Sequence, residues 1–371
     1  MKRSSIVLIS LALAAVLAGA WFLFWPRMSL PQDPLAAVPA DAYAVVRIRV
    51  DRVLASEAWK KLVVEQGQAR GIERVEVTCG FNPLARLTEL VVFARPTPAG
   101  GVPRLAFAAR GDLRHAELLD CVKKFTGGDA SGLVQEEIEG IPAVHSKKGN
   151  SRAAFIGRDG IIGGDADSVN AAIQTLLGKA PSMASDTQLK GLFSEIEQGS
   201  DITVVARVPA DMKPLIQQLA ELAGPQLQQL DQVRLVGANL TSRVNVLTGS
   251  ATLVTLGPEQ AASLVALGKA AVGRILAIPL IDLTPAGNVL RSVQMEALGD
   301  RATYAGAIKV ETILALLSFV PKLDDMRKDL ASDKPAAVQA PTPTVEPIQA
   351  PAPDAGSKHH ARRPRPEPTA P

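Results

Sequence analysis

The feature that most constrains this chain is an uncharged apolar run, IVLISLALAAVLAGAWFLFW, at residues 6–25. As an α-helix this run rises about 30 Å, which matches the hydrocarbon core of a bilayer. Lys2 and Arg3 precede the run, and Trp21 and Trp25 near its far end favour the lipid–water boundary. The positive-inside rule therefore predicts a single-pass signal anchor in a bacterial cell membrane, with the rest of the chain periplasmic or extracellular.

A cleaved signal peptide is the alternative interpretation of the same run. Ala18-Gly19-Ala20 has the small-residue spacing that signal peptidase uses. Cleavage after Ala20 would leave an exposed aromatic N-terminus, so the sequence favours the uncleaved transmembrane helix. A lipid-anchored protein is excluded, because its attachment cysteine would end the apolar run and the first cysteine is Cys79.

Composition divides the remaining chain into a Pro-containing spacer, a long region of mixed helix and strand pattern, and a tail. The tail is dominated by Pro, Ala, Thr and Gln, and it lacks the apolar side chains that would offset its ordering entropy. The predicted segments are a cytoplasmic N-terminus (1–5), the anchor (6–25), the spacer (26–40), a first α+β unit (41–180), a second α+β unit (181–331) and a disordered tail (332–371).

Two similarities within the chain suggest an internal repeat. Residues 41–51, DAYAVVRIRVD, resemble residues 201–211, DITVVARVPAD, and residues 104–122 resemble residues 302–320. The two pairs have different offsets, so a duplication would have absorbed insertions; chance similarity in an Ala- and Val-rich chain is the alternative. The predicted fold class is α+β: two similar units, each a largely antiparallel sheet with helices on one face.

Hydrophobic periodicity places the individual elements. We expect strands at residues 43–50, 88–95, 104–110, 152–157, 160–163, 202–208, 245–255, 290–298 and 302–309. Apolar stripes predict helices at 112–125, 167–178, 209–223 and 258–272, and Trp59 also lies in a predicted helix. Asp165 or Asp167 can cap the helix that Gly178 ends.

Cys79 and Cys121 are the only cysteines, and both lie in the exported part of the chain. An oxidising compartment allows them to pair. Cys121 falls on the apolar side of its predicted helix, and Cys79 ends the strand-like run VEVTC, so both can point inward. We predict a disulfide; the alternative is two buried free thiols. A catalytic cysteine is not expected, because no histidine is suitably placed.

Histidines and acidic loops offer little further chemistry. Of the four histidines, His359 and His360 lie in the predicted tail, and His115 is expected to face solvent in the first turn of its helix. His145 alone makes no metal site or catalytic triad. The run GRDGIIGGDADS at residues 157–168 invites a calcium or phosphate interpretation, but it lacks the residues of an EF-hand or Walker loop. It is explained by a hairpin turn, a strand and a helix cap.

Arg47 and Asp51 recur as Arg207 and Asp211 in the possible repeat, which raises the possibility of a paired binding site. Strand alternation places Arg47 opposite Val46 and its apolar neighbours, so we expect Arg47 on a solvated sheet face. Asp51 and Asp211 are then ordinary strand-end or helix-cap residues. No catalytic, cofactor-binding or metal-binding residue is predicted.

The number and placement of charged residues indicate which classes of partner the chain can bind. The chain has 40 basic and 37 acidic side chains, a net charge of +3, so no nucleic-acid surface is expected. The basic stretch KHHARRPRP at residues 358–366 could contact envelope proteins or anionic polymers and lipid headgroups; the alternative is an unconstrained tail.

Three segments carry a resemblance: VPADAYAVVRI at 38–48, CGFNP at 79–83 and FIGRDGIIGGDADSVNAAI at 155–173. The chain loosely resembles uncharacterised bacterial signal-anchored envelope proteins, over about residues 39–330. The resemblance implies location and architecture, and no activity. We expect a non-catalytic binding or scaffolding protein of the cell envelope. The alternatives are a carrier of lipid or another small apolar ligand, and an envelope hydrolase.

Overall fold

The computed structural model describes residue 30 and residues 33–66, 70–97, 102–125, 132–147, 149–208 and 230–315. The predicted anchor (6–25), the predicted helix at 209–223 and the predicted tail (332–371) lie outside these residues. Within them, no helix combines the length and the hydropathy that crossing a bilayer requires.

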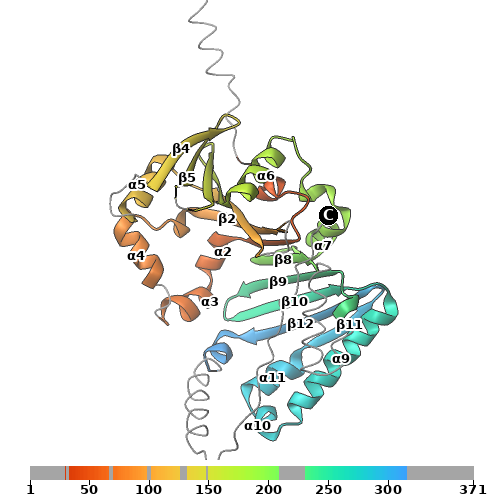
Figure 1. The fold of residues 1–371 in the computed structure, drawn as a ribbon. Helices are drawn as coiled ribbons and strands as arrows, with labels where there is room; N and C mark the ends of the chain where they lie inside the picture. Colours follow the sequence, from red (N-terminus) through yellow and green to blue (C-terminus); the bar gives the residue numbers. More distant parts are fainter. Residues whose placement is uncertain are drawn as a thin grey trace, which may run out of the picture. The chain divides into compact units, whose positions relative to one another are not determined.

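The described strands form one antiparallel sheet of 12 strands (Figure 1). Its order is β11-β12-β10-β9-β8-β1-β2-β3-β7-β6-β5-β4. The strand bounds are β1 Ala44–Ile48, β2 Leu87–Arg95, β3 Arg104–Gly111, β4 Leu133–Ile138, β5 Ile141–Ser146, β6 Ser151–Ile156, β7 Gly160–Asp165, β8 Ile202–Arg207, β9 Leu235–Arg243, β10 Val246–Val254, β11 Gln294–Leu298 and β12 Arg301–Lys309.

Helices connect the strands. The α-helices are α2 Val50–Ala55, α3 Glu57–Trp59, α4 Arg70–Cys79, α5 His115–Phe125, α6 Ala166–Leu176, α7 Thr187–Ile196, α9 Pro258–Leu276, α10 Pro279–Asp282 and α11 Pro285–Ser292. The short turns are the 3-10 helices η1 Pro34–Ala37, η3 Leu84–Arg86 and η5 Met183–Ser185 and the π-helix η2 Lys60–Val64.

The antiparallel pair β1 and β8 lies at the centre of the sheet, where Val45 faces Val205 directly. Outward from β8 the order is β9, β10, β12, β11; outward from β1 it is β2, β3, β7, β6. The same relative arrangement of five strands therefore stands on each side of this pair. The boundary that we predicted near residue 180 falls between α6 and α7, and the sheet continues across it.

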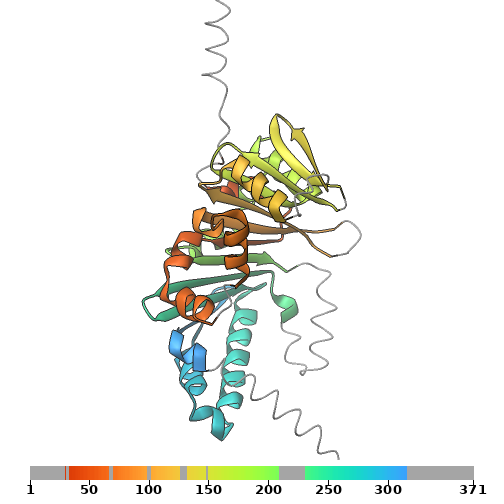
Figure 2. The ribbon, with the colours of Figure 1, turned by 90° about the vertical axis from the view of Figure 1, so that its left-hand side faces the viewer.

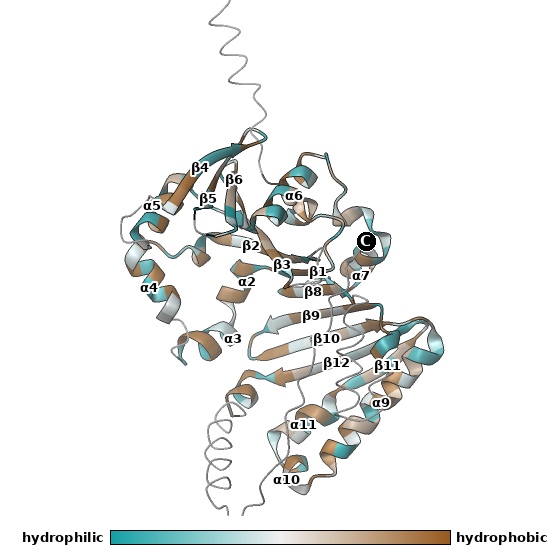
Figure 3. Cartoon of the chain, in the orientation of Figure 1, coloured by the Kyte–Doolittle hydropathy of each residue, from teal (hydrophilic) through white to brown (hydrophobic). Residues whose placement is uncertain are grey.

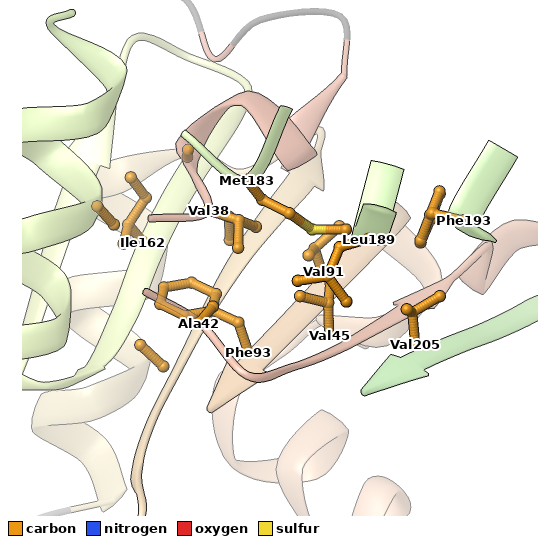
Figure 4. Close-up of a cluster of buried hydrophobic side chains, with 14 of the residues drawn as sticks. Val38, Ala42, Val45, Val91, Phe93, Ile162, Met183, Leu189, Phe193 and Val205 are labelled. Carbon is orange, nitrogen blue, oxygen red and sulfur yellow. The ribbon is translucent and has the colours of Figure 1, made fainter. Parts of the chain in front are cut away.

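The main core lies on the sheet face that carries Val45 (Figure 4). Val91, Phe93 and Val205 share this face, and all are 1% exposed or less. They pack against Val38, which follows η1, and against α6 and α7, which contribute Ile173, Leu189 and Leu192. Adjacent strand residues point to opposite faces, so Val46 and its neighbours form a second apolar face.

Helices cover that second face too. Val236, Leu253 and Ala302 lie in one cross-strand row of this face and pack against Leu264 of α9. α2 contacts β2 and α3 contacts β9. In Figure 2 the orange helices lie in front of the strands, and Figure 3 shows the hydrophobic and hydrophilic residues of α9. The prediction of helices on one face is therefore wrong, because this sheet is apolar on both faces.

The predicted α+β class with an antiparallel sheet is confirmed, and most predicted strands match within a few residues. Three strands were missed: β4, β5 and β9. Two expectations were wrong: residues 290–292 belong to α11, and VEVTC ends the helix α4. α6 begins and ends as predicted, with Asp165 accepting hydrogen bonds from two amides and Gly178 at φ +70°.

Truncation of Leu192 tests the core. Leu192 is 2% exposed and Leu283 is 86% exposed. We expect Leu192→Ala to lower the free energy of unfolding of the full-length chain by about 2–5 kcal/mol, because it leaves a cavity beneath the central strands. Leu283→Ala, the same chemical change, should stay within about 0.5 kcal/mol. Denaturant titration measures both, and equal effects would contradict this core assignment.

Candidate functional site

An apolar pocket of about 460 Å³ lies on the second sheet face, between the strands β2, β3 and β7 and the helix α5. Its size is within the usual range of small-molecule sites. Every side chain that lines it is a hydrocarbon. The lining residues are Pro83, Leu87, Leu90, Val92, Leu105, Ala106, Phe107, Ala109, Leu113, Leu118, Ile161 and Gly164.

The strand sequences explain why this face is apolar. In β2, Val91 and Phe93 face the main core, so Leu90 and Val92 point to the opposite face. The register pairs Leu90 with Ala109 and Val92 with Phe107, which continues the apolar surface onto β3. Both faces of these strands are therefore apolar, and only one of them is filled by the main core.

Two glycines of β7 shape the pocket wall. Phe107 of β3 lies opposite Gly163, and a Cβ atom on Gly163 would come within 2.6 Å of the Phe107 ring. The next residue, Gly164, has φ +137°, which favours glycine, and a Cβ there would meet the β3 backbone at 2.5 Å. The sequence GG at 163–164 thus lets the Phe107 ring lie across the neighbouring strand. These two glycines of the run at residues 157–168, which had invited a calcium or phosphate interpretation, therefore have a packing role.

Three interactions hold α5 over the pocket: a disulfide, an ion pair and a stacked pair of rings. Cys79 of α4 and Cys121 of α5 form a disulfide with a Cα–Cα distance of 4.6 Å. Glu117 of α5 accepts a hydrogen bond from Arg86. His115, at the start of α5, stacks on Phe155 of β6 with ring centroids 3.8 Å apart. The expectation that His115 faces solvent is wrong, since a ring from a distant strand lies against it.

α9 occupies the equivalent position in the other half of the sheet, because α5 follows β3 and α9 follows β10. There the helix packs directly on the strands. The Tyr304 hydroxyl of β12 donates to the Leu264 carbonyl of α9 at 2.8 Å. A Cβ on Gly268 of α9 would lie 2.7 Å from the Tyr304 ring. Among the described residues, the space in this other half is smaller, about 150 Å³, and it lies between α2, α3 and the strands β8, β9 and β10.

A second, charged cleft of about 630 Å³ lies at the edge of the main core. Arg47 lines it and is not on a solvated face as expected: its side chain is only 13% exposed. It forms ion pairs with Glu89 and Glu197, and Arg49 also contacts Glu197 at 3.2 Å. Arg47 lies on the Val45 face, where helix α7 ends at Glu197 and provides its partner. Asp51 is neither a strand end nor a cap: it lies in the first turn of α2, whose N-cap is Arg49.

The cleft holds four arginines and four carboxylates, which balance one another. Burial raises the pKa of the Glu89 carboxyl, and the nearby Arg47 guanidinium opposes this rise. Among the described lining residues, Thr88 carries the only hydroxyl, and there is no histidine or cysteine. Within this cleft Arg47 pairs with Glu89, and Arg110 Nε lies 3.8 Å from Asp159, so ion pairs account for part of its charge.

The remaining candidates from the sequence have structural partners. His145 Nδ1 lies 3.2 Å from Glu136, which also pairs with Arg152 at 2.7 Å, so these side chains join β4, β5 and β6. Arg207 pairs with Asp186, the N-cap of α7. Asp211 lies outside the described residues, as do His359 and His360. Among the residues that the structure describes, no three His, Cys, Asp or Glu side chains are grouped to hold a metal ion.

No residue of the apolar pocket was predicted to bind a ligand, although Leu118 lies on the apolar side of the helix expected at 112–125. The available signal was the uninterrupted apolar character of LVVFA in β2 and LAFAA in β3, because a strand that is apolar at successive positions must be covered on both faces. The GG pair of β7 was a second signal. The position of α5 above these strands was not available from the sequence.

Comparison with known proteins assigns no family. No family model matches the chain, and no curated protein matches it. Among solved structures, crystal form III of TP0453 has a TM-score of 0.43 and 13% identity, and covers 78% of this chain and 98% of that one. Crystal forms IV and I have TM-scores of 0.41 and 0.40 and 14% identity, and each covers 77% of this chain and 96% of that one. At this level the similarity carries no argument about function.

Removal of the disulfide should weaken the fold around α5. The bond closes a loop with a sequence separation of 42. We expect the double substitution Cys79→Ser and Cys121→Ser to lower the free energy of unfolding by about 2–4 kcal/mol, because the unfolded chain gains freedom. Denaturant titration with and without reductant measures this. Reductant should destabilise the natural chain and leave the double variant unchanged; an unchanged natural chain would contradict the prediction.

His115 should make the fold sensitive to acid. Burial lowers the pKa of His115 below its usual 6.5. As the pH falls through about 6.5, the unfolded chain therefore binds the proton first, and the free energy of unfolding decreases. His115→Phe keeps an aromatic ring without a titrating group, so the decrease between neutral and mildly acidic pH should become shallower. Identical pH profiles by thermal unfolding would show that His115 does not contribute.

Proposed function

We propose that this chain is a non-catalytic binding protein of the cell envelope that holds the hydrocarbon chain of an amphiphile in the pocket beneath α5. The observation that carries the proposal is the pocket lining, which is entirely hydrocarbon over about 460 Å³. Such a surface offers no hydrogen bond to a polar ligand, and it favours a chain of methylene groups.

The energetics support an apolar chain. Each buried methylene contributes about 0.8 kcal/mol of transfer free energy, before the cost of ordering the ligand. Leu105 is 57% exposed and lines the pocket, so apolar surface is accessible at this rim. Occupation of the pocket would remove that surface from water.

The comparison of the two halves supports the same proposal. On the other side of the sheet α9 packs on β11 and β12, and Val236 and Leu253 join the same cluster, whereas β2, β3 and β7 border the larger pocket. The disulfide to α4, the ion pair with Arg86 and the stacking of His115 on Phe155 of β6 hold α5 in place. A helix held in this way maintains the space beneath it.

The envelope location rests on the predicted anchor at residues 6–25 and on the disulfide. Disulfides persist in oxidising compartments, which fits a chain exported from the cytoplasm. A membrane tether would hold the pocket near lipids, the main source of amphiphiles, and raise its effective concentration toward them. The envelope hydrolase has no specific support, since Thr88 carries the only hydroxyl among the described residues that line the charged cleft, and no histidine or cysteine lies among them.

A charge at the pocket rim tests the proposal. Binding of the neutral fluorescent probe N-phenyl-1-naphthylamine is titrated with the full-length chain. We expect Leu105→Asp to weaken binding by about 10- to 100-fold, because it removes apolar contact and places a carboxylate at the pocket.

Leu298→Asp is the matched control. Leu298 is 75% exposed on β11, at the other end of the sheet order, and its substitution should leave the affinity unchanged. Equal loss in both variants, or no saturable binding by the natural chain, would contradict the proposed function.

A further inference from the structure

A charged cluster lies beside the apolar pocket. It consists of Arg86, Arg114 and Glu117. Each of these residues is next in the chain to a residue that lines the pocket: Leu87, Leu113 and Leu118. The cluster therefore borders the pocket on both the sheet side and the α5 side.

Glu117 lies between the two guanidinium groups. Arg86 Nη1 donates to one carboxylate oxygen of Glu117, and Arg114 Nη1 donates to the other at 3.2 Å. Arg86 also lies over the Phe81 ring, 4.2 Å from its centroid, which fixes the direction of its side chain. These hydrogen bonds hold the pKa of the Glu117 carboxyl below its usual value, so Glu117 is ionised at neutral pH.

The two arginines have more N–H donors than the Glu117 carboxylate uses. The contacts to Glu117 engage one nitrogen from each guanidinium, and a guanidinium carries several N–H donors in a planar fork. Asp112 lies 3.9 Å from Arg114 Nε and is 70% exposed at its side chain, so it is well solvated. Arg114 is itself 66% exposed and can turn toward a ligand.

We propose that the ligand is an anionic single-chain amphiphile whose head group is bound by Arg86 and Arg114 while its hydrocarbon chain occupies the pocket. This inference rests on the proposed function and adds the class of head group. The chain supplies binding free energy through burial, and the head group selects among ligands of equal chain length. Glu117 competes with the head group for the same two guanidinium groups.

Because Glu117 competes with the head group, a substitution of Arg114 and a substitution of Glu117 should change the preference for an anionic ligand in opposite directions. Dodecanoate and dodecanol have the same chain and differ in the charge of the head group. Each is titrated against full-length protein loaded with N-phenyl-1-naphthylamine. We expect dodecanoate to displace the probe at about tenfold lower concentration than dodecanol, since charge-assisted hydrogen bonds add to chain burial.

Arg114→Gln should remove most of the difference between the two ligands, and Glu117→Gln should enlarge it by freeing both guanidinium groups. The measured quantity is the ratio of the two displacement concentrations within each variant, so a loss of chain binding common to both ligands cancels. Arg243→Gln, at an exposed arginine that ends β9, is the matched control and should leave both affinities as they are. High salt should reduce the preference for dodecanoate, because Arg114 is exposed to screening.

Three outcomes would overturn the inference. They are equal displacement by dodecanoate and dodecanol, changes of the same sign in the two cluster variants, and displacement of the probe by inorganic phosphate alone. The first two leave the proposed function intact, since the chain would still bind. Failure of the probe and of both amphiphiles to bind would instead contradict the proposed function itself.

Discussion

The pairing of β1 with β8 is the interaction on which the rest of the structure depends. It joins strands that lie about 160 residues apart in the chain and turns two sets of strands into one sheet. Val45 and Val205 meet at its centre, fully buried beneath the core that η1, α6 and α7 complete. Without this pair, both strands would present open edges, and neither half would have a complete cover on the Val45 face.

The two sides of this central pair share a strand order but differ in how their second face is covered. On one side, Gly268 allows α9 to approach the Tyr304 ring and pack closely. On the other side, α5 is held by a disulfide, an ion pair and a ring stack, and space remains beneath it. Close packing leaves no room for a ligand, whereas a helix held by cross-links leaves apolar side chains for a ligand to cover.

Local sequence patterns predicted the elements where one physical signal was clear. The apolar stripe with Asp165 and Gly178 at its ends predicted α6, and β2 and β3 lie where strands were expected, at 88–95 and 104–110. β9 was missed because Gly237, Asn239 and Ser242 are poor strand formers. Tertiary contacts explain why Gly237 and Asn239 stand in this strand. Gly237 makes room for Leu192 and Ile196 of α7, and the Asn239 side chain donates to the Ile196 carbonyl at 2.7 Å.

The sequence by itself determined the α+β class, most strands, the ends of α6 and the two cysteines that can pair. Only the tertiary structure decided which sheet face forms the main core, where Arg47 lies, and that α5 stands above β2 and β3. The physical reason is that hydrophobic periodicity measures the difference in apolar character between the two sides of a helix or strand. In strands that are apolar on both sides, this difference vanishes, and distant helices decide which face is filled and which retains a pocket.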